Sequence, residues 1–169
     1  MVSDSFVMHP SVPQGLTLAL YKGVRPGAAG IANRVGRYLD GGPYSHTELI
    51  LSNRVSISSS FVDKGVRAKN VGYSSVGCWD FLRIPDPTGQ LEVNAINWYL
   101  EHVGCEYDVW GNIRFGIGFA RQSEDKWFCS ESNAAMLGHR EPWRYGPSGL
   151  LVLEQAVRGS ELITVERVV

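Results

Sequence analysis

The segment "KWFCSES", residues 126–132, places Cys129 between a large aromatic residue and a Ser-Glu-Ser run that small helix-forming residues follow. If a helix begins at or just after Cys129, the thiol lies where unpaired backbone N–H groups and the positive end of the helix dipole converge. That environment lowers the pKa of a thiol, and the thiolate is the form that attacks a carbonyl carbon. Free cysteine also behaves as a small hydrophobe, so a buried, inert Cys129 is the alternative. The nucleophile hypothesis therefore needs a base elsewhere in the chain.

His46 is the best candidate for that base among the four histidines, and histidine is the usual base for a thiol nucleophile. It opens a β-rich run directly after Gly-Gly-Pro-Tyr-Ser, where its ring can face a polar site without interrupting the core. Residues i and i+2 share a face of a strand, so Glu48 lies beside His46 with Cα atoms about 7 Å apart. A carboxylate there can hold one ring nitrogen and leave the other for the thiol. The predicted catalytic residues are Cys129, His46 and Glu48.

Two serines compete with Glu48 for the role of orienting His46. A hairpin loop of two residues would place Ser59 across from Glu48, and a loop of three residues would place Ser58 there. Either hydroxyl could orient the imidazole ring, although less strongly than a carboxylate. The non-catalytic alternatives also stay open. In these, His46 is an ordinary histidine on an edge strand and Glu48 is a charged side chain that faces solvent.

The elements that must position these residues follow from hydrophobic patterning and turn signals. Strands are expected over 15–23, over both arms of a hairpin at 41–61 with a polar tip at 52–54, over 77–85 and over 161–169, with 64–69 extending the second hairpin strand. Helices are expected over 28–40, over 90–103 behind a Thr88 cap, over 129–137, and from behind Pro147 and Ser148 to Gly159. Residues 107–125 form a glycine-punctuated connector. This order predicts one compact α+β domain over 15–169 behind a loose leader at 1–14.

The composition excludes several classes of protein. The chain has 169 residues, a formal net charge of −1 and 44% hydrophobic residues, so neither disorder nor nucleic-acid binding is expected. No apolar run approaches the ~20 residues that span a bilayer, and the N-terminal segment does not resemble a signal peptide, which makes the cytoplasm the expected location. The three cysteines form no CxxC pair, so neither a disulfide framework nor a structural zinc site is expected, and Cys78 and Cys105 are expected to be structural. The chemistry above needs no metal or organic cofactor.

The order of these motifs resembles a known family. "YSHTELIL", a following strand that ends in "GVR", a "YD" element with glycines and "FCSES" at the start of a helix are similar to the circularly permuted branch of the NlpC-type papain-fold cysteine hydrolases. That branch includes YiiX-like proteins and relatives of lecithin retinol acyltransferase. In it the cysteine helix follows the histidine strand, as Cys129 follows His46 here.

The resemblance implies a permuted papain-like fold, in which an antiparallel sheet or half-barrel packs against the cysteine helix, with Cys129 as nucleophile and His46 as base. The family's third polar residue often lies on the strand after the histidine strand, where this chain has "ISSS". "GCEYDVWG" resembles the family's G-x-x-Y element, which implies that the Tyr107 hydroxyl helps to form the oxyanion hole. The alternative interpretation, in which Tyr107 only packs under a glycine-rich loop, stays open.

The expected activity is cysteine-dependent hydrolysis of a peptide or cell-wall peptide amide through a thioester acyl-enzyme, with a peptide-like or acyl substrate as partner. Cleavage of wall peptides would need delivery in a phage particle or release on lysis. The alternatives are a lipid acyltransferase or thioesterase, an inactive binding or structural module on the same fold, and a redox sensor that uses Cys129.

Overall fold

The computed structural model describes residues 9–24, 34, 37, 38, 40–73, 75–109 and 125–165. The strands are β1 (Thr17–Tyr21), β2 (His46–Ile50), β3 (Val55–Ser60), β4 (Gly65–Asn70), β5 (Trp79–Arg83), β6 (Glu106–Tyr107), β7 (Lys126–Trp127) and β8 (Glu161–Thr164). The α-helices with defined bounds are α2 (Gln90–His102), α4 (Cys129–Met136) and α5 (Pro147–Arg158), and short 3₁₀ turns cover Val76–Cys78 and Pro142–Arg144.

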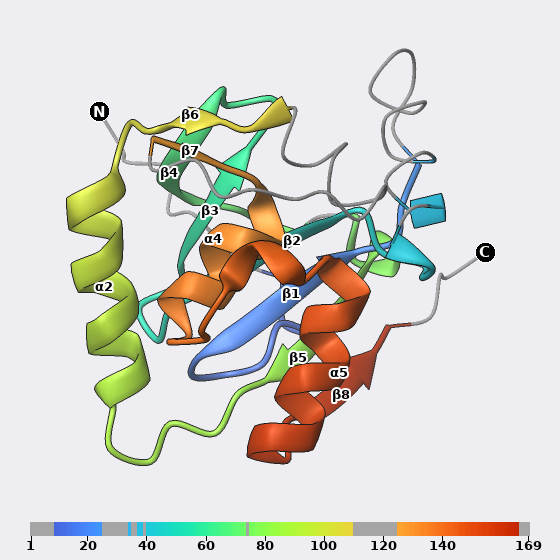
Figure 1. Cartoon of the computed structure of the whole chain (residues 1–169). Helices are drawn as coiled ribbons and strands as arrows, with labels where there is room; N and C mark the ends of the chain where they lie inside the picture. Colours follow the sequence, from blue (N-terminus) through green and yellow to red (C-terminus); the bar gives the residue numbers. More distant parts are fainter. Residues whose placement is uncertain are drawn as a thin grey trace, which may run out of the picture.

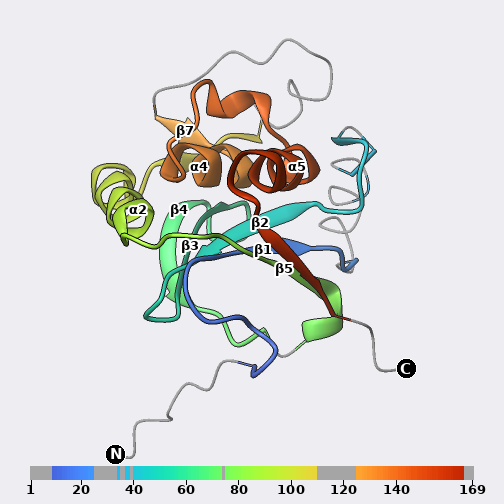
Figure 2. The same ribbon diagram turned by 90° about the horizontal axis from the view of Figure 1, so that it is seen from below.

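The strands form one curled, half-barrel sheet in the order β7-β6-β4-β3-β2-β1-β5-β8. All described pairings are antiparallel except that of β6 with β7. Helices α2, α4 and α5 lie side by side on one face of this sheet (Figures 1 and 2). The α+β class is therefore confirmed, whereas the permuted papain-like identity of the fold stays a prediction.

Alternation along β1 and β2 explains why both faces of the sheet are buried. Leu18, Leu20 and Leu49 are fully buried in the core that includes residues of α2, α4 and α5. Ala19 and Ile50, which point to the other face, belong to a second apolar cluster around Tyr73, Trp79 and Phe81. The central strands are thus covered on both sides, which fixes their register firmly because a slip of one residue would exchange the two faces.

The hairpin of β2 and β3 has a three-residue tip at 52–54. Leu49 pairs with Ile57 and Ile50 with Ser56, and the Leu51 backbone N–H donates to the Val55 carbonyl. Arg54 takes a left-handed conformation with φ of 72°, which lets the tip close without the usual glycine. Continuing the ladder by one residue sets Ser58, rather than Ser59, across from Glu48.

The expectation that 64–69 extends the second hairpin strand is wrong. The chain turns back at 61–64, and β4 runs antiparallel to β3 with Ser58 paired to Arg67. The turn has no glycine before Lys64, and Lys64 itself adopts the left-handed conformation with φ of 66°. This turn places the charged residues of β4 on the side of β3 that is remote from β1.

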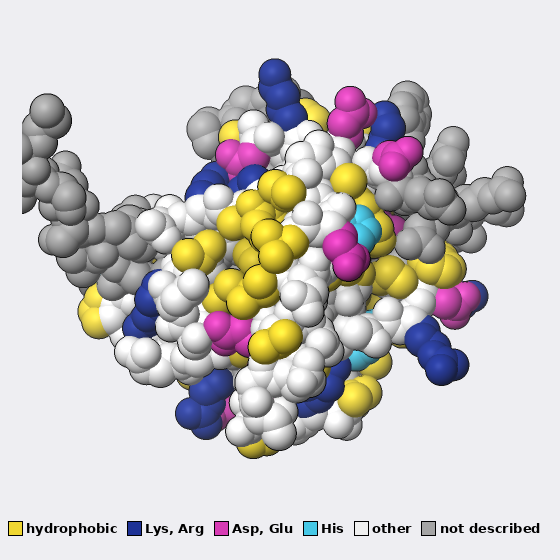
Figure 3. All heavy atoms as spheres, turned by 90° about the vertical axis from the view of Figure 1, so that its left-hand side faces the viewer, with side chains coloured by type: hydrophobic (Ala, Val, Ile, Leu, Met, Phe, Trp, Pro, Cys, Tyr) yellow, Lys and Arg dark blue, Asp and Glu magenta, His cyan; other side chains and the backbone are white. Residues whose placement is uncertain are grey.

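The helices agree with the hydrophobic periodicity, with small differences at their caps. Gly89 rather than Thr88 is the N-cap of α2, and the Asp86 carboxylate accepts the N–H groups of Leu91 and Glu92 at 3.2 and 2.9 Å. Gly138 and Gly159 follow α4 and α5 in left-handed conformations, as helix-ending glycines do. On the outward side of α2 and at its C-terminal end, Val93, Leu100 and Val103 are each about half exposed or more. A band of hydrophobic side chains faces the viewer in Figure 3.

Two expected segments fall largely outside the described residues. Within the helix expected at 28–40, residues 34, 37, 38 and 40 are helical, and residues 110–124 of the connector are outside. The described part of the leader, 9–14, packs against the domain, because Val12 is 2% exposed in the second apolar cluster. The Arg54 guanidinium donates to the Val12 carbonyl at 3.2 Å.

Candidate active site

Cys129 is the first residue of α4, and the sheet holds that end of the helix in place. Strand β7 pairs in parallel with β6 through Trp127 and Tyr107, so the chain enters α4 directly from the sheet. Phe128, which is 2% exposed, precedes the helix as its N-cap. The Ser130 N–H in the first turn of α4 is therefore among the groups that stabilise the Cys129 thiolate.

His46 is the first residue of β2, and hydrogen bonds dock α4 directly onto that strand. The Asn133 side chain donates from Nδ2 to the Thr47 Oγ1 at 2.8 Å, which joins α4 to the residue after His46. A second hydrogen bond joins α4 to the neighbouring strand β3, because the Ser59 N–H donates to the Ser132 Oγ at 3.2 Å. The start of β2 and the first turns of α4 are thus fixed relative to each other.

The Cys129 thiol and the His46 imidazole are close enough to stabilise each other's charged forms. Burial opposes ionisation of the Cys129 thiol, but the charge and hydrogen bond of His46 outweigh it and lower the pKa of the thiol, helped by the backbone N–H groups of Thr47 and Ser130. Burial likewise disfavours the His46 cation, yet the negative charge of Cys129, followed by Glu48, raises the pKa of His46 to about 9. These opposite shifts favour a thiolate–imidazolium pair near neutral pH.

Glu48 lies against the other side of the imidazole ring. Its Oε1 is 3.3 Å from the His46 Nε2, which leaves Nδ1 as the ring nitrogen for the thiol. Glu48 is 3% exposed, and although burial would raise its pKa, His46 and then Arg67 lower it to about 2. The side chain is thus a buried carboxylate that contacts the imidazolium at all ordinary pH values.

Glu48 has partners on its other side as well. Arg67 of β4 donates from Nη2 to Oε1 at 2.9 Å and from Nη1 to Oε2 at 3.4 Å. The Tyr73 hydroxyl donates to Oε2 at 3.5 Å, and it also contacts the Ser56 hydroxyl at 3.0 Å. The Glu48 carboxylate is consequently surrounded by donors instead of facing solvent.

The two serines that competed with Glu48 are occupied by backbone carbonyl groups. Ser58 donates from Oγ to the Thr47 carbonyl at 2.7 Å, and Ser59 donates from Oγ to the Trp127 carbonyl at 2.6 Å. Ser59 thereby ties β3 to the strand that precedes Cys129. Among the three candidates, Glu48 is the one for which the structure records a contact with the His46 ring.

Tyr107 lies near the cysteine strand in the sheet, but its ring has another contact. Its backbone pairs with Trp127, two residues before Cys129, and its ring packs edge-on against Phe61 with centroids 5.7 Å apart. The Tyr107 position is thus compatible with packing, and its role in an oxyanion hole stays a prediction.

Sequence reasoning missed Arg67, and also a buried acid in the first turn of α4. Glu131 is 2% exposed and its carboxylate accepts the Phe128 N–H at 3.3 Å. Burial raises the pKa of Glu131 to about 8, and the negative charge of Asp108 adds to this shift. A Glu at the third helical position is a typical capping signal, so the residue could have been found from its spacing alone.

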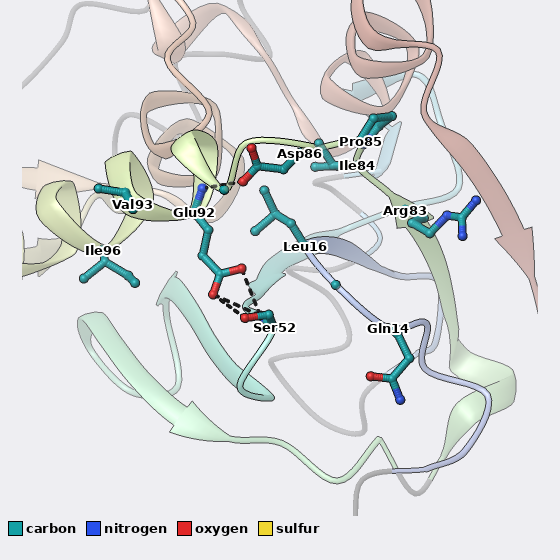
Figure 4. A pocket seen from close by; sticks show the side chains of 12 residues that line it. Gln14, Leu16, Ser52, Arg83, Ile84, Pro85, Asp86, Glu92, Val93 and Ile96 are labelled. Atoms are coloured by element: carbon teal, nitrogen blue, oxygen red, sulfur yellow. Dashed lines mark hydrogen bonds between the residues drawn. The ribbon is translucent and has the colours of Figure 1, made fainter.

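A separate pocket of about 560 Å³ opens at the opposite end of the central strands (Figure 4). Leu16, just before β1, and Ser52, just after β2, line it, whereas His46 opens β2 at the far end. Across the pocket Glu92 of α2 accepts the Ser52 hydroxyl at 2.7 Å. This pocket is therefore distinct from the Cys129–His46 pair.

The comparisons with known proteins leave the family open. The chain matches no protein-family model and no curated protein. Within the described ranges, no group of three or more His, Cys, Asp and Glu side chains could hold a metal ion. Nor does any described helix have both the length and the apolar character that crossing a membrane requires. The permuted NlpC-type family stays a prediction that rests on the motifs.

Proposed function

We propose that this protein is a thiol hydrolase that cleaves an amide bond through a thioester acyl-enzyme. One observation carries the proposal, namely that Cys129 at the start of α4, His46 and Glu48 lie in series, with the imidazole stabilising the thiolate and the Glu48 Oε1 3.3 Å from the His46 Nε2. A buried cysteine that only fills space has no need of an imidazole partner, and still less of a buried carboxylate behind it. Perturbed pKa values that arise from specific charge partners are typical of functional sites.

Acylation follows from the protonation states of the pair. The Cys129 thiolate attacks the carbonyl carbon of the substrate amide and forms a C–S bond, while the carbonyl π electrons move to the oxygen. The His46 imidazolium then gives its Nδ1 proton to the amide nitrogen, the C–N bond breaks, and the amine leaves. Glu48 accepts the hydrogen bond of Nε2 throughout, so the ring keeps its orientation while it loses the proton.

Deacylation uses the same residues in the reverse roles. Neutral His46 takes a proton from a water molecule at Nδ1 as the water oxygen attacks the thioester carbon. The C–S bond breaks, the carboxylic acid product leaves, and Cys129 returns to the thiolate paired with imidazolium. The N–H groups in the first turn of α4 supply donors for the oxyanion in both steps, and we assign the Tyr107 hydroxyl as a further donor.

An amide of a peptide or a cell-wall peptide is the substrate class that we propose first. Transfer or hydrolysis of a lipid acyl group uses the same acyl-enzyme chemistry, so a substrate panel must separate the two. A peptide anilide, an acyl ester and an acyl thioester, each with the same acyl group, provide that comparison. Faster turnover of the anilide than of uncatalysed controls, lost in Cys129→Ala, supports the amidase; turnover of the esters alone would replace it by an acyl-ester enzyme.

Alkylation tests the activated pair independently of any substrate. Iodoacetamide is applied between pH 5 and 9, and the adduct is located by mass spectrometry. An ordinary thiol with a pKa of about 8.5 is less than about 1% thiolate at pH 6, so Cys129 should react at least about tenfold faster than Cys105, in which burial raises the thiol pKa. His46→Ala should abolish that advantage. Reaction of Cys129 at an ordinary thiol rate would refute the enzyme and leave a binding or structural module.

A further inference from the structure

We propose that Arg67 is a positioning residue, whose guanidinium holds the Glu48 carboxylate against the Nε2 atom of His46. The inference rests on the proposed function in one respect only, because it assumes that the orientation of His46 matters for chemistry. Among the described residues, the side-chain partners of Arg67 are Glu48 and Asp63, so Arg67 reaches His46 only through Glu48. Its role is therefore distinct from that of the orienting carboxylate.

The register of the sheet brings Arg67 to Glu48 over a serine. Glu48 on β2, Ser58 on β3 and Arg67 on β4 occupy one row across three neighbouring strands, since Ser58 pairs with Arg67 and the β2–β3 ladder continues to Glu48. Residues in such a row point to the same face, and β2 and β4 are about 10 Å apart. The small Ser58 side chain turns its hydroxyl back to the Thr47 carbonyl. This leaves space over β3 through which the long Arg67 side chain reaches Glu48.

The guanidinium is anchored on both of its sides, which makes it suitable as a clamp. Its Nη atoms form two contacts with Glu48, at 2.9 and 3.4 Å, and its Nε donates to the Asp63 Oδ2 at 2.8 Å. Asp63 is in turn held by Lys69, whose Nζ donates to both carboxylate oxygens at 2.7 and 2.9 Å. A planar fork that is fixed at one end defines where its partner carboxylate can lie at the other.

Glu48 needs such a clamp because His46 and Tyr73 contact different oxygen atoms of its carboxylate. Oε1 faces His46 at 3.3 Å, a long contact, whereas Oε2 faces the Tyr73 hydroxyl at 3.5 Å. Arg67 contacts both oxygens and so fixes the plane of the carboxylate between them. Without it, rotation of Glu48 toward Tyr73 would remove Oε1 from the imidazole ring.

Positioning and simple charge compensation predict opposite changes in the proton affinity of His46. If Arg67 only neutralises Glu48, then removing its positive charge exposes His46 to an uncompensated carboxylate, and the pKa of His46 rises. If Arg67 positions Glu48, then its removal costs His46 the carboxylate contact, and the pKa of His46 falls toward its ordinary value of about 6.5. The charged and titratable groups around the carboxylate are His46, Arg67 and Tyr73, with Asp63 and Lys69 behind Arg67 and Cys129 behind His46.

The test is an NMR titration of the His46 imidazole in the full chain with Cys129→Ala, so that the coupled thiol does not titrate. Arg67→Met should lower the pKa of His46 so that the imidazolium-to-imidazole ratio at a given pH falls about tenfold. Arg67→Lys keeps the charge but not the fork, and should restore the ratio only in part. Lys69→Met is the matched control, because Lys69 shares Asp63 with Arg67 but does not contact Glu48, and it should leave the titration unchanged.

An unchanged or raised pKa of His46 in Arg67→Met overturns the proposal, as does full restoration by Arg67→Lys or an equal fall in Lys69→Met. If Arg67→Met does not fold, Arg67→Lys decides alone, since a wild-type titration in that variant excludes a role for the fork. The titration involves neither the thiol nor a substrate. It therefore gives its answer even if Cys129 proves to be unreactive, in which case the proposed function fails and the positioning of Glu48 by Arg67 stands.

Discussion

Replacing Glu48 by glutamine should shift the pH profile of Cys129 alkylation. The pKa of His46 is raised from 6.5 to about 9, which corresponds to about 3 kcal/mol in favour of the imidazolium. Cys129 makes the larger favourable contribution and Glu48 the smaller one, so we assign about 1 to 1.5 kcal/mol to Glu48. Glutamine keeps the shape and one acceptor oxygen but loses the charge.

The assay is the rate of iodoacetamide alkylation of Cys129 between pH 5 and 9. A loss of about 1 to 1.5 kcal/mol weakens the thiolate–imidazolium pair about tenfold, so the acidic limb of the profile should move to higher pH and the rate at pH 6 should fall about tenfold. Thermal unfolding is measured in parallel, because Arg67 loses a charged partner but keeps Asp63, and a loss of about 1–3 kcal/mol in unfolding free energy is expected.

Ser58→Ala and Ser59→Ala are the matched controls, since both residues lie close to the same site on β3. Their hydroxyl groups bond to backbone carbonyls, so neither variant should move the acidic limb, although each should lose about 1 kcal/mol of stability. A wild-type profile in Glu48→Gln, or a shift of equal size in either serine variant, would refute the assignment of Glu48 as the orienting residue.

Three further predictions concern residues around the pair. Glu131→Gln should leave the free energy of unfolding nearly unchanged at pH 4.5 and raise it at pH 8 by on the order of 2–4 kcal/mol, measured by thermal or urea unfolding. The folded-state pKa of this carboxyl, about 8, lies above its unfolded value, so the wild-type side chain increasingly destabilises the fold as pH rises between the two. Equal effects of the substitution at both pH values would contradict this reasoning. Glu154→Gln should cost about 3 kcal/mol in the same assay, since it removes the buried partner of Arg158 and His139, while Cys129 alkylation stays unchanged; a stable variant would show that this ion cluster contributes little. Tyr107→Phe should slow acyl turnover about a hundredfold without affecting alkylation, in which no oxyanion forms, and unaltered turnover would leave Tyr107 as a packing residue.

The hairpin of β2 and β3 shows what local pattern can predict. Alternating apolar residues gave both strands, and the choice between Ser58 and Ser59 opposite Glu48 depended only on the length of the loop. That length could not be read from the sequence, because Arg54 adopts the left-handed conformation that glycine usually marks. The pairing of His46 with Glu48 needed only the period of a strand and was therefore within reach.

Arg67 was out of reach for a related reason. The turn at 61–64 also uses a non-glycine residue, Lys64, at positive φ, so the sequence shows no turn signal there. Residues 64–69 are therefore predicted to continue the preceding strand. On that assignment Arg67 would extend away from Glu48. Once the chain turns back, β4 pairs with β3 and the row of Glu48, Ser58 and Arg67 forms, which is a tertiary consequence that no local signal carries.

The link between Thr47 and Asn133, 86 positions apart in the chain, has a consequence for biosynthesis. During translation the histidine strand leaves the ribosome long before the cysteine helix, and loop closure over such a distance delays the final docking. Until α4 reaches β2, Cys129 is an ordinary thiol with little nucleophilicity at neutral pH. On the proposed function, Cys129 therefore stays unactivated through the early stages of folding, and the docking of α4 onto β2 is the event that activates it.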